Sequence, residues 1–158
     1  MGKGNETMHA AKIRALAVVA SALLLHSCAT LADADRPLEG TSWRLVEMQS
    51  MDDSQGVTRP SNPDLYTVEF DRSGSAYVQL DCNRVLAPWT ATRTGAGQGA
   101  LEFGPPASTS TTCPQAPLGE RLGKQLGFVR SWLMRDGRLN MSLMADGGIL
   151  VWERKGSR

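Results

Sequence analysis

The chain has 158 residues, of which 41% are hydrophobic and 21% are charged, with 17 basic and 16 acidic residues. Three of the basic residues and one of the acidic residues lie in the first 27 positions, so the rest of the chain has a net charge of −1. Because phosphate binding needs a basic face, we expect no nucleic-acid partner.

The chain begins with the pattern of a signal peptide. Lys3, Lys12 and Arg14 give a basic segment. The apolar run that follows, residues 15–25, is shorter than the roughly 20 residues that span a bilayer. We therefore exclude residues 1–27 from the folded domain.

The sequence LHSC at residues 25–28 resembles the lipobox of bacterial lipoproteins. Cys28 is the predicted lipidation site, and residues 28–38 are the predicted tether. Two or more acyl chains anchor a protein stably to a membrane. The residue after Cys28 is Ala29 rather than aspartate. By resemblance to the sorting rules of two-membrane bacteria, this implies an outer-membrane lipoprotein that faces the periplasm. The alternative is ordinary secretion, with cleavage after the ADA of residues 32–34, so that Cys28 is removed.

Both histidines, His9 and His26, belong to the predicted leader. The mature domain therefore lacks the base of Ser-His and Cys-His pairs and the commonest zinc ligand. We predict a non-catalytic protein without a metal or other cofactor. The enzymatic alternative is a hydrolase that uses Asp81 with Glu69 or Asp71.

Residues 39–155 are predicted to form one domain of short strands separated by turns. The first three strands are expected at 41–48, 65–70 and 75–82. A polar loop separates the first of them from the second. Strict alternation predicts one buried face on the second and third strands, formed by Tyr66, Val68 and Phe70 and by Ala76, Val78, Leu80 and Cys82.

Further strands are expected at 88–94 and 99–103, joined by a glycine-rich hairpin loop. Its glycines lack the Gly-Lys-Ser/Thr sequence of a phosphate-binding loop. Three more strands near 131–134, 139–144 and 149–154 are separated by Asp-Gly turns, a strong hairpin signal. Their methionines could bind Cu(I), but core packing is their ordinary use: Met134, Met141 and Met144.

A single helix is expected within residues 114–130. Leucines and one valine recur at helical spacing, and a second row at the same spacing consists of glycines: Leu118, Leu122, Leu126 and Val129, and Gly119, Gly123 and Gly127. Glycines let a helix approach a sheet closely. The predicted fold is a β-rich α+β domain, a small antiparallel sheet or barrel-like meander of seven to eight strands with one packed helix.

Cys82 and Cys113 remain in the predicted mature chain. Export to an oxidising compartment favours a disulfide between them. Two unpaired thiols and metal ligation are the alternatives. Asn83, Arg84 and Trp89 follow the first cysteine and could form a recognition surface. In the other interpretation Asn83 is a turn residue, Arg84 is solvated and Trp89 is packed.

The chain resembles the META domain family, which includes the HslJ-type heat-inducible proteins. The resemblance covers about residues 39–155 and rests on GTSWRL, VEFDRSG, CNRVLAPW, TSTTC, Glu120, Leu126, GRLNMSL and ILVWE, in this order. It implies a compact β-rich domain with one helix, often in bacterial lipoproteins or exported proteins. Family associations are heat shock, novobiocin resistance and, in parasite relatives, virulence or secretion. It implies no established catalytic activity and no cofactor.

Two hypotheses of function follow. In the first, the chain is a lipid-anchored, non-catalytic envelope protein that supports stress or antibiotic tolerance by binding another envelope component. In the second, it is an exported module that binds a small ligand or inhibits a protease.

Overall fold

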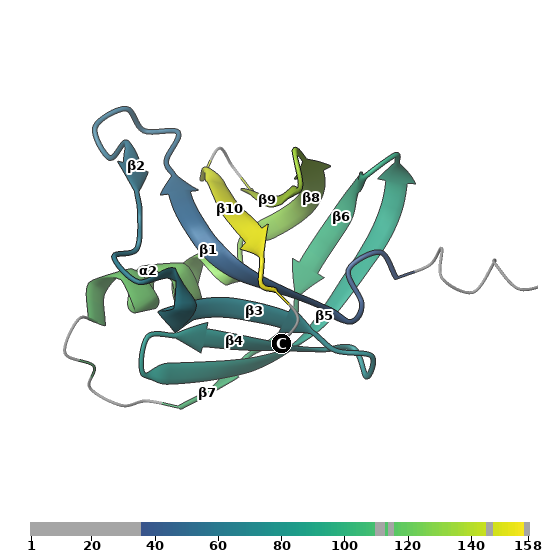
Figure 1. The fold of residues 1–158 in the computed structure, drawn as a ribbon, viewed down its shortest axis with the longest axis horizontal. Helices are drawn as coiled ribbons and strands as arrows, with labels where there is room; N and C mark the ends of the chain where they lie inside the picture. The colour runs from purple at the N-terminus through teal and green to yellow at the C-terminus, as the bar shows by residue number, and fades with distance from the viewer. Residues whose placement is uncertain (1–35, 110–112, 114–115, 145–146, 157–158) are drawn as a thin grey trace, which may run out of the picture. The chain divides into compact units, whose positions relative to one another are not determined.

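Eight antiparallel strands of the described residues close into a barrel in which each strand pairs with its neighbours along the chain (Figure 1). Pairing between the first and the last strand closes the barrel. This confirms the predicted β-rich meander with one helix. The barrel strands are β1 (Thr41–Gln49), β3 (Tyr66–Phe70), β4 (Ser75–Leu80), β5 (Asn83–Gly95), β6 (Gln98–Phe103), β8 (Val129–Arg135), β9 (Arg138–Leu143) and β10 (Ile149–Arg154).

The computed structural model describes residues 36–156, apart from 110–112, 114–115 and 145–146. The predicted signal peptide, Cys28 and most of the predicted tether lie outside these ranges. Within them, no helix has the length and apolar character that a bilayer crossing requires.

The predicted alternation in β3 and β4 is confirmed. Tyr66, Val68 and Phe70 on β3 are buried, and so are the apolar residues of β4. Cys82, however, does not continue the buried row. Asp81 has a left-handed backbone, with φ at 60°, which ends β4 at Leu80 and leaves Cys82 in an exposed turn.

The carboxyl-terminal meander is also confirmed. The first Asp-Gly pair turns the chain between β8 and β9 with left-handed φ angles, 51° at Asp136 and 74° at Gly137, as a tight hairpin requires. Part of the second Asp-Gly pair lies outside the described residues. Met141 is fully buried and Met134 packs against the core, whereas Met144 is 42% exposed. Core packing therefore accounts for Met141.

Large side chains fill the interior of the barrel. Those of Trp43, Trp152 and Phe70 are fully buried, together with leucines from β1, β6, β9 and β10. An eight-stranded barrel has an interior just wide enough for such filling. Any ligand of this domain therefore meets it on the outer surface or at an end.

Helix α2 (Ala116–Leu126) lies at one end of the barrel, beside β4 (Figure 1). Leu122 and Leu126 are buried in the core, as the helical spacing predicts. Val129, which shares that spacing, instead begins β8. Three short elements complete the fold: β2 (Val57–Thr58), the 3-10 helix η1 (Pro63–Leu65) and β7 (Ala107–Ser108).

Candidate functional site

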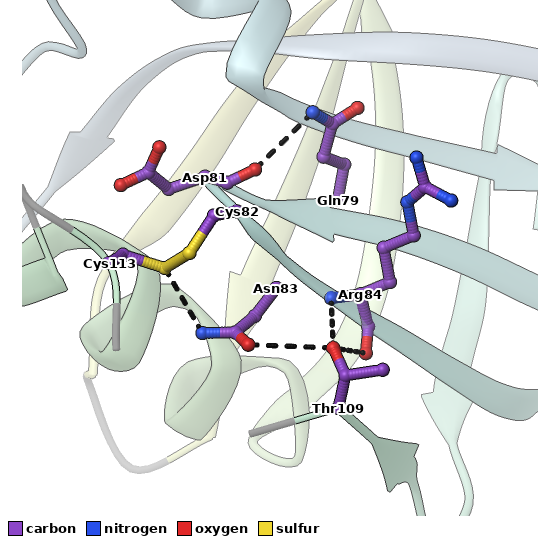
Figure 2. The surroundings of a disulfide bond; sticks show 7 residues. All are labelled: Gln79, Asp81, Cys82, Asn83, Arg84, Thr109 and Cys113. Carbon is purple, nitrogen blue, oxygen red and sulfur yellow. Dashed lines mark hydrogen bonds between the residues drawn. A yellow bond between two sulfur atoms is a disulfide. The ribbon is translucent and has the colours of Figure 1, made fainter. Parts of the chain in front are cut away.

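A disulfide joins Cys82 in the β4–β5 turn to Cys113, just before α2 (Figure 2). The two Cα atoms are 5.7 Å apart, and the cysteines are 31 residues apart in sequence. This confirms the predicted pairing over free thiols and metal ligation. Within the described ranges, no group of three or more His, Cys, Asp or Glu residues could hold a metal ion.

Asn83 closes the β4–β5 turn and also supports this disulfide. It is the first residue of β5 and pairs with Leu80 across the hairpin. Its Nδ2 donates to Sγ of Cys113 at 3.2 Å, and Thr109 Oγ1 donates to its Oδ1 at 3.4 Å. The backbone N–H of Arg84 donates to Thr109 Oγ1 at 3.0 Å, as Figure 2 shows. Asn83 and Thr109 thus connect the disulfide to β5.

Arg84 and Trp89 lie on opposite faces of β5. The Arg84 side chain is exposed and points away from the disulfide (Figure 2). Trp89 is only 6% exposed. Its ring packs edge-on against Phe70, with ring centroids 4.8 Å apart. Trp89 is therefore a core residue, as the packed alternative predicts, and Arg84 alone of the pair lies on the surface.

A cavity of about 650 Å³ lies between α2 and the strands β5, β6 and β7, beside Cys113. Its apolar lining consists of Leu80, Val85, Ala87, Phe103 and Leu126, and its polar lining includes Asn83, Ser108, Thr109, Glu120 and Lys124. Volumes between about 300 and 1,000 Å³ are usual for small-molecule sites. We call this the α2 cavity; it is the candidate functional site.

Two opposite charges lie one helical turn apart at the α2 cavity. Glu120 and Lys124 are both exposed, and both line the cavity. A glutamate four residues before a lysine is well placed for an ion pair on a helix. The ion pairs of the described residues nevertheless do not include this one. Both charges can therefore interact with a bound molecule.

No motif of the sequence predicts this cavity. Glu120 appeared only as part of the family resemblance, and Lys124 and Phe103 did not appear as site residues. The nearest sequence signal is the predicted glycine row, because Gly119 and Gly123 of α2 and Gly127, directly after α2, all line the cavity.

Gly119 and Gly123 bring α2 close to the end of β4, and alanine should separate their roles. A Cβ at Gly119 would lie 3.1 Å from the Leu80 carbonyl oxygen, whereas one at Gly123 would lie 3.0 Å from the Leu80 Cδ1 atom, which can move. We expect Gly119→Ala to lower the free energy of unfolding by about 1–2 kcal/mol. Gly123→Ala should leave it unchanged or raise it by up to about 1 kcal/mol. Urea unfolding of both variants measures this; equal effects would contradict the different contacts.

Asp81 lies near the buried Tyr66, at the α2 end of the barrel. The backbone N–H of Asp81 donates to the Leu65 carbonyl oxygen at 2.8 Å. Burial raises the pKa of the Tyr66 phenol, and the nearby Asp81 charge raises it further. The phenol is therefore a neutral core group at neutral pH rather than an acid or base of the site.

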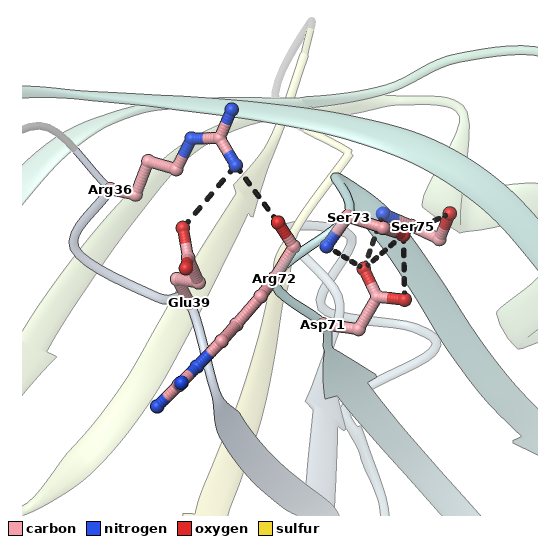
Figure 3. Close-up of polar contacts among 6 residues, drawn as sticks. All are labelled: Arg36, Glu39, Asp71, Arg72, Ser73 and Ser75. Atoms are coloured by element: carbon pink, nitrogen blue, oxygen red, sulfur yellow. Dashed lines mark hydrogen bonds and ion pairs between the residues drawn. The ribbon is translucent and has the colours of Figure 1, made fainter.

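The hydrolase alternative pairs Asp81 with Glu69 or Asp71, and neither lies beside Asp81. Glu69 pairs with Tyr77, four residues before Asp81. Asp71 follows β3 and Asp81 follows β4, so the full length of β4 separates them. Asp71 instead organises the β3–β4 turn, as Figure 3 shows. Its Oδ1 accepts the backbone N–H groups of Ser73 at 2.9 Å and Ser75 at 2.8 Å.

These hydrogen bonds make the β3–β4 turn sensitive to acid. The backbone N–H of Ser75, followed by the Ser73 groups, holds the pKa of Asp71 below its ordinary value near 3.8. A lowered pKa contributes stability above the ordinary value, and this contribution is lost as pH falls through the lowered one. We expect Asp71→Ala to be less stable than wild type in urea at pH 7, and the difference to shrink as the pH falls toward 2. The exposed Asp53→Ala is the control, and a difference that did not shrink with falling pH would contradict this account.

Comparison with known proteins identifies the family. The META domain profile matches residues 36–156. An NMR structure of a protein from Burkholderia xenovorans is similar, with a TM-score of 0.58, 22% identity, and coverage of 84% of this chain and 97% of that chain. A crystal structure of a duf4847 family protein from Bacteroides vulgatus has a TM-score of 0.50 and 10% identity, and covers 77% of this chain and 96% of that chain.

These two likenesses show the fold. No curated protein matches in sequence. The profile match extends over the barrel and α2. The chain belongs to the META domain family.

Proposed function

We propose that this protein is a lipid-anchored, non-catalytic protein of the bacterial envelope that binds another envelope component at the α2 cavity. The observation that carries the proposal is the cavity itself, which has an apolar lining and a few polar groups beside a disulfide. An apolar lining with a few polar groups is typical of binding sites. A role in heat or antibiotic tolerance is consistent with the family and forms part of the proposal.

The position of α2 suits an anchored protein. Thr41, at the start of β1, pairs with Phe70 at one end of β3, whereas Leu80, beside α2, pairs with Tyr66 at the other end. Arg36 donates to the Arg72 carbonyl oxygen at 3.1 Å, which fastens the beginning of the domain to the β3–β4 turn (Figure 3). The preceding segment therefore joins the barrel at the end opposite to α2, the helix that carries Glu120 and Lys124.

The anchor is tested by replacing Cys28. We expect the wild-type chain in the membrane fraction and Cys28→Ser outside it, because the variant lacks the lipidated thiol. Cell fractionation with immunoblotting measures this. Complete retention of Cys28→Ser in membranes would refute the anchor.

The binding role is tested by crosslinking from the cavity in intact cells. A photoreactive p-benzoyl-phenylalanine at Ser108, which lines the cavity, should form a defined adduct that is lost when Gly127→Phe narrows the cavity. Gly156→Phe is the matched control, because a Cβ at Gly156 has open space around it. Adducts that form equally in both variants, with and without heat or novobiocin, would refute binding at this site. If the specific crosslink forms but the protein is not anchored to the membrane, the second hypothesis holds, that of an exported ligand-binding module.

A further inference from the structure

We propose that the α2 cavity takes a zwitterionic amphiphile, a molecule with one apolar chain next to an ammonium group and an anionic group. This inference rests on the proposed function and names the chemistry of its ligand. It follows from the apolar lining, from the two unlike charges of α2, and from the rigid walls on both sides.

The apolar part of the cavity fits a chain. Val85 and Ala87 are inward-facing residues of β5, and Leu126 is a buried residue of α2. Together with Leu80 and Phe103 they surround the cavity with aliphatic and aromatic surface. Burying each methylene of a ligand in such surroundings tightens binding roughly fourfold.

The charges of α2 specify the head group. An anionic ligand would be attracted by Lys124 and repelled by Glu120, and a cationic ligand would meet the opposite situation. A ligand with both charges satisfies both side chains. The Ser108 and Thr109 side chains add hydroxyl groups to the lining. The neighbouring unlike charges therefore favour a zwitterion over either singly charged amphiphile.

The walls of the cavity are held in place by the fold. On one side, β7 pairs with β5 through Ser108 and Val85. On the other, the disulfide fixes Cys113, which also lines the cavity. Gly123 and Gly127 contribute no side chain to this space. A site that keeps its shape in the absence of ligand loses little conformational entropy on binding.

The test uses residues 29–158, which contain the whole barrel, and three probes with the same ten-carbon chain, all below their micelle concentrations. Decylphosphocholine is zwitterionic, decanoate is anionic and decylamine is cationic; phosphocholine without a chain is the fourth ligand. Isothermal titration calorimetry at neutral pH should show one decylphosphocholine per chain. Decanoate and decylamine should bind about fivefold more weakly, and phosphocholine should not bind measurably.

Removing one of the two charges should change the order of the affinities of the charged probes. Lys124→Gln should weaken decylphosphocholine and decanoate twofold to fivefold, as expected for exposed charges, and should strengthen decylamine. Glu120→Gln should weaken decylphosphocholine and decylamine and strengthen decanoate. Lys155→Gln and Glu69→Gln are the matched controls outside the cavity, and both should bind like wild type.

The location of the binding site is tested by placing a large side chain in the cavity. Gly127→Phe should weaken decylphosphocholine at least tenfold, while Gly156→Phe should not. Near-UV circular dichroism shows whether Gly127→Phe folds. If it does not fold, the site is located instead from the chemical shifts of the backbone amides of the wild type, measured with and without decylphosphocholine. On addition of decylphosphocholine these shifts should change in α2 and β7 and stay constant at Gly137, in the β8–β9 turn.

The inference fails if decylphosphocholine does not saturate the chain, or if it binds Lys124→Gln and Glu120→Gln like wild type. It also fails if Gly127→Phe folds and binds like wild type. If these probes fail to bind as expected but Ser108 still forms its specific crosslink in cells, only the ligand class is refuted. If the probes fail and the specific crosslink is also missing, the proposed function is refuted as well.

Discussion

Replacing Cys82 and Cys113 together by alanine should lower the free energy of unfolding by about 3.5 kcal/mol. The disulfide closes a loop of 31 residues, and a crosslink over that length removes conformational entropy from the unfolded chain. Cys113 is 7% exposed and Asn83 donates to its sulfur, so the variant also loses a contact in the folded state. In a domain of this size, the melting temperature should fall by roughly 10–20 °C.

Urea unfolding of the oxidised wild type, the reduced wild type and the double variant measures this loss. The two forms without the disulfide should have similar midpoints, both below that of the oxidised chain. A double variant as stable as the oxidised wild type would show that the surrounding hydrogen bonds suffice to hold the β4–β5 turn against the segment before α2.

Replacing Gly99 by alanine should destabilise the barrel by about 3 kcal/mol or more, a large effect for one methyl group. Gly99 is a buried residue of β6, and an added Cβ would overlap the carbonyl oxygen of Thr92. The same oxygen accepts a hydrogen bond from the Trp132 indole N–H at 3.2 Å. The indole nitrogen would also lie 2.8 Å from the new Cβ.

The matched control is Gly127→Ala. A Cβ at Gly127 lies at ordinary van der Waals distance, 3.7 Å, from its nearest neighbour, the Lys124 carbonyl oxygen. The free energy of unfolding of Gly127→Ala should stay within about 0.5 kcal/mol of the wild-type value. Thermal unfolding by circular dichroism measures both variants, and equal melting temperatures would contradict the predicted overlap at Gly99.

The parts of the fold that could be predicted depend on local signals. The alternation of Tyr66, Val68 and Phe70 defines one strand and its buried face, because successive side chains of a strand point in opposite directions. The Asp136-Gly137 pair defines a tight turn, because both residues adopt left-handed backbone angles. Such signals need no knowledge of distant parts of the chain.

Other features depend on contacts between distant residues. Pro88 suggested the beginning of a strand, but β5 begins at Asn83 and Pro88 lies within it, paired with Ser75. With the true beginning, the alternation of Val85, Ala87 and Trp89 places the tryptophan in the core. The signal for Trp89 was therefore present but hidden by the wrong strand limit.

The cavity could not be predicted from the sequence. It exists because α2 packs against Leu80 while β7 pairs with β5, and these contacts join segments that are far apart in the chain. The glycine row indicated close packing of a helix on a sheet, but gave no sign that the face carrying Glu120 and Lys124 would border an apolar space.

The pairing of β1 with β10 sets the order in which the barrel can be completed. Most strand pairs join neighbours in sequence and can form as soon as both strands exist, but Trp43 pairs with Arg154. During synthesis, β1 therefore has one free edge until every other barrel strand has been made. Pairing strands that are far apart in sequence slows folding. A chain that ends before β10 exposes two unpaired strand edges, which can pair with other chains and aggregate.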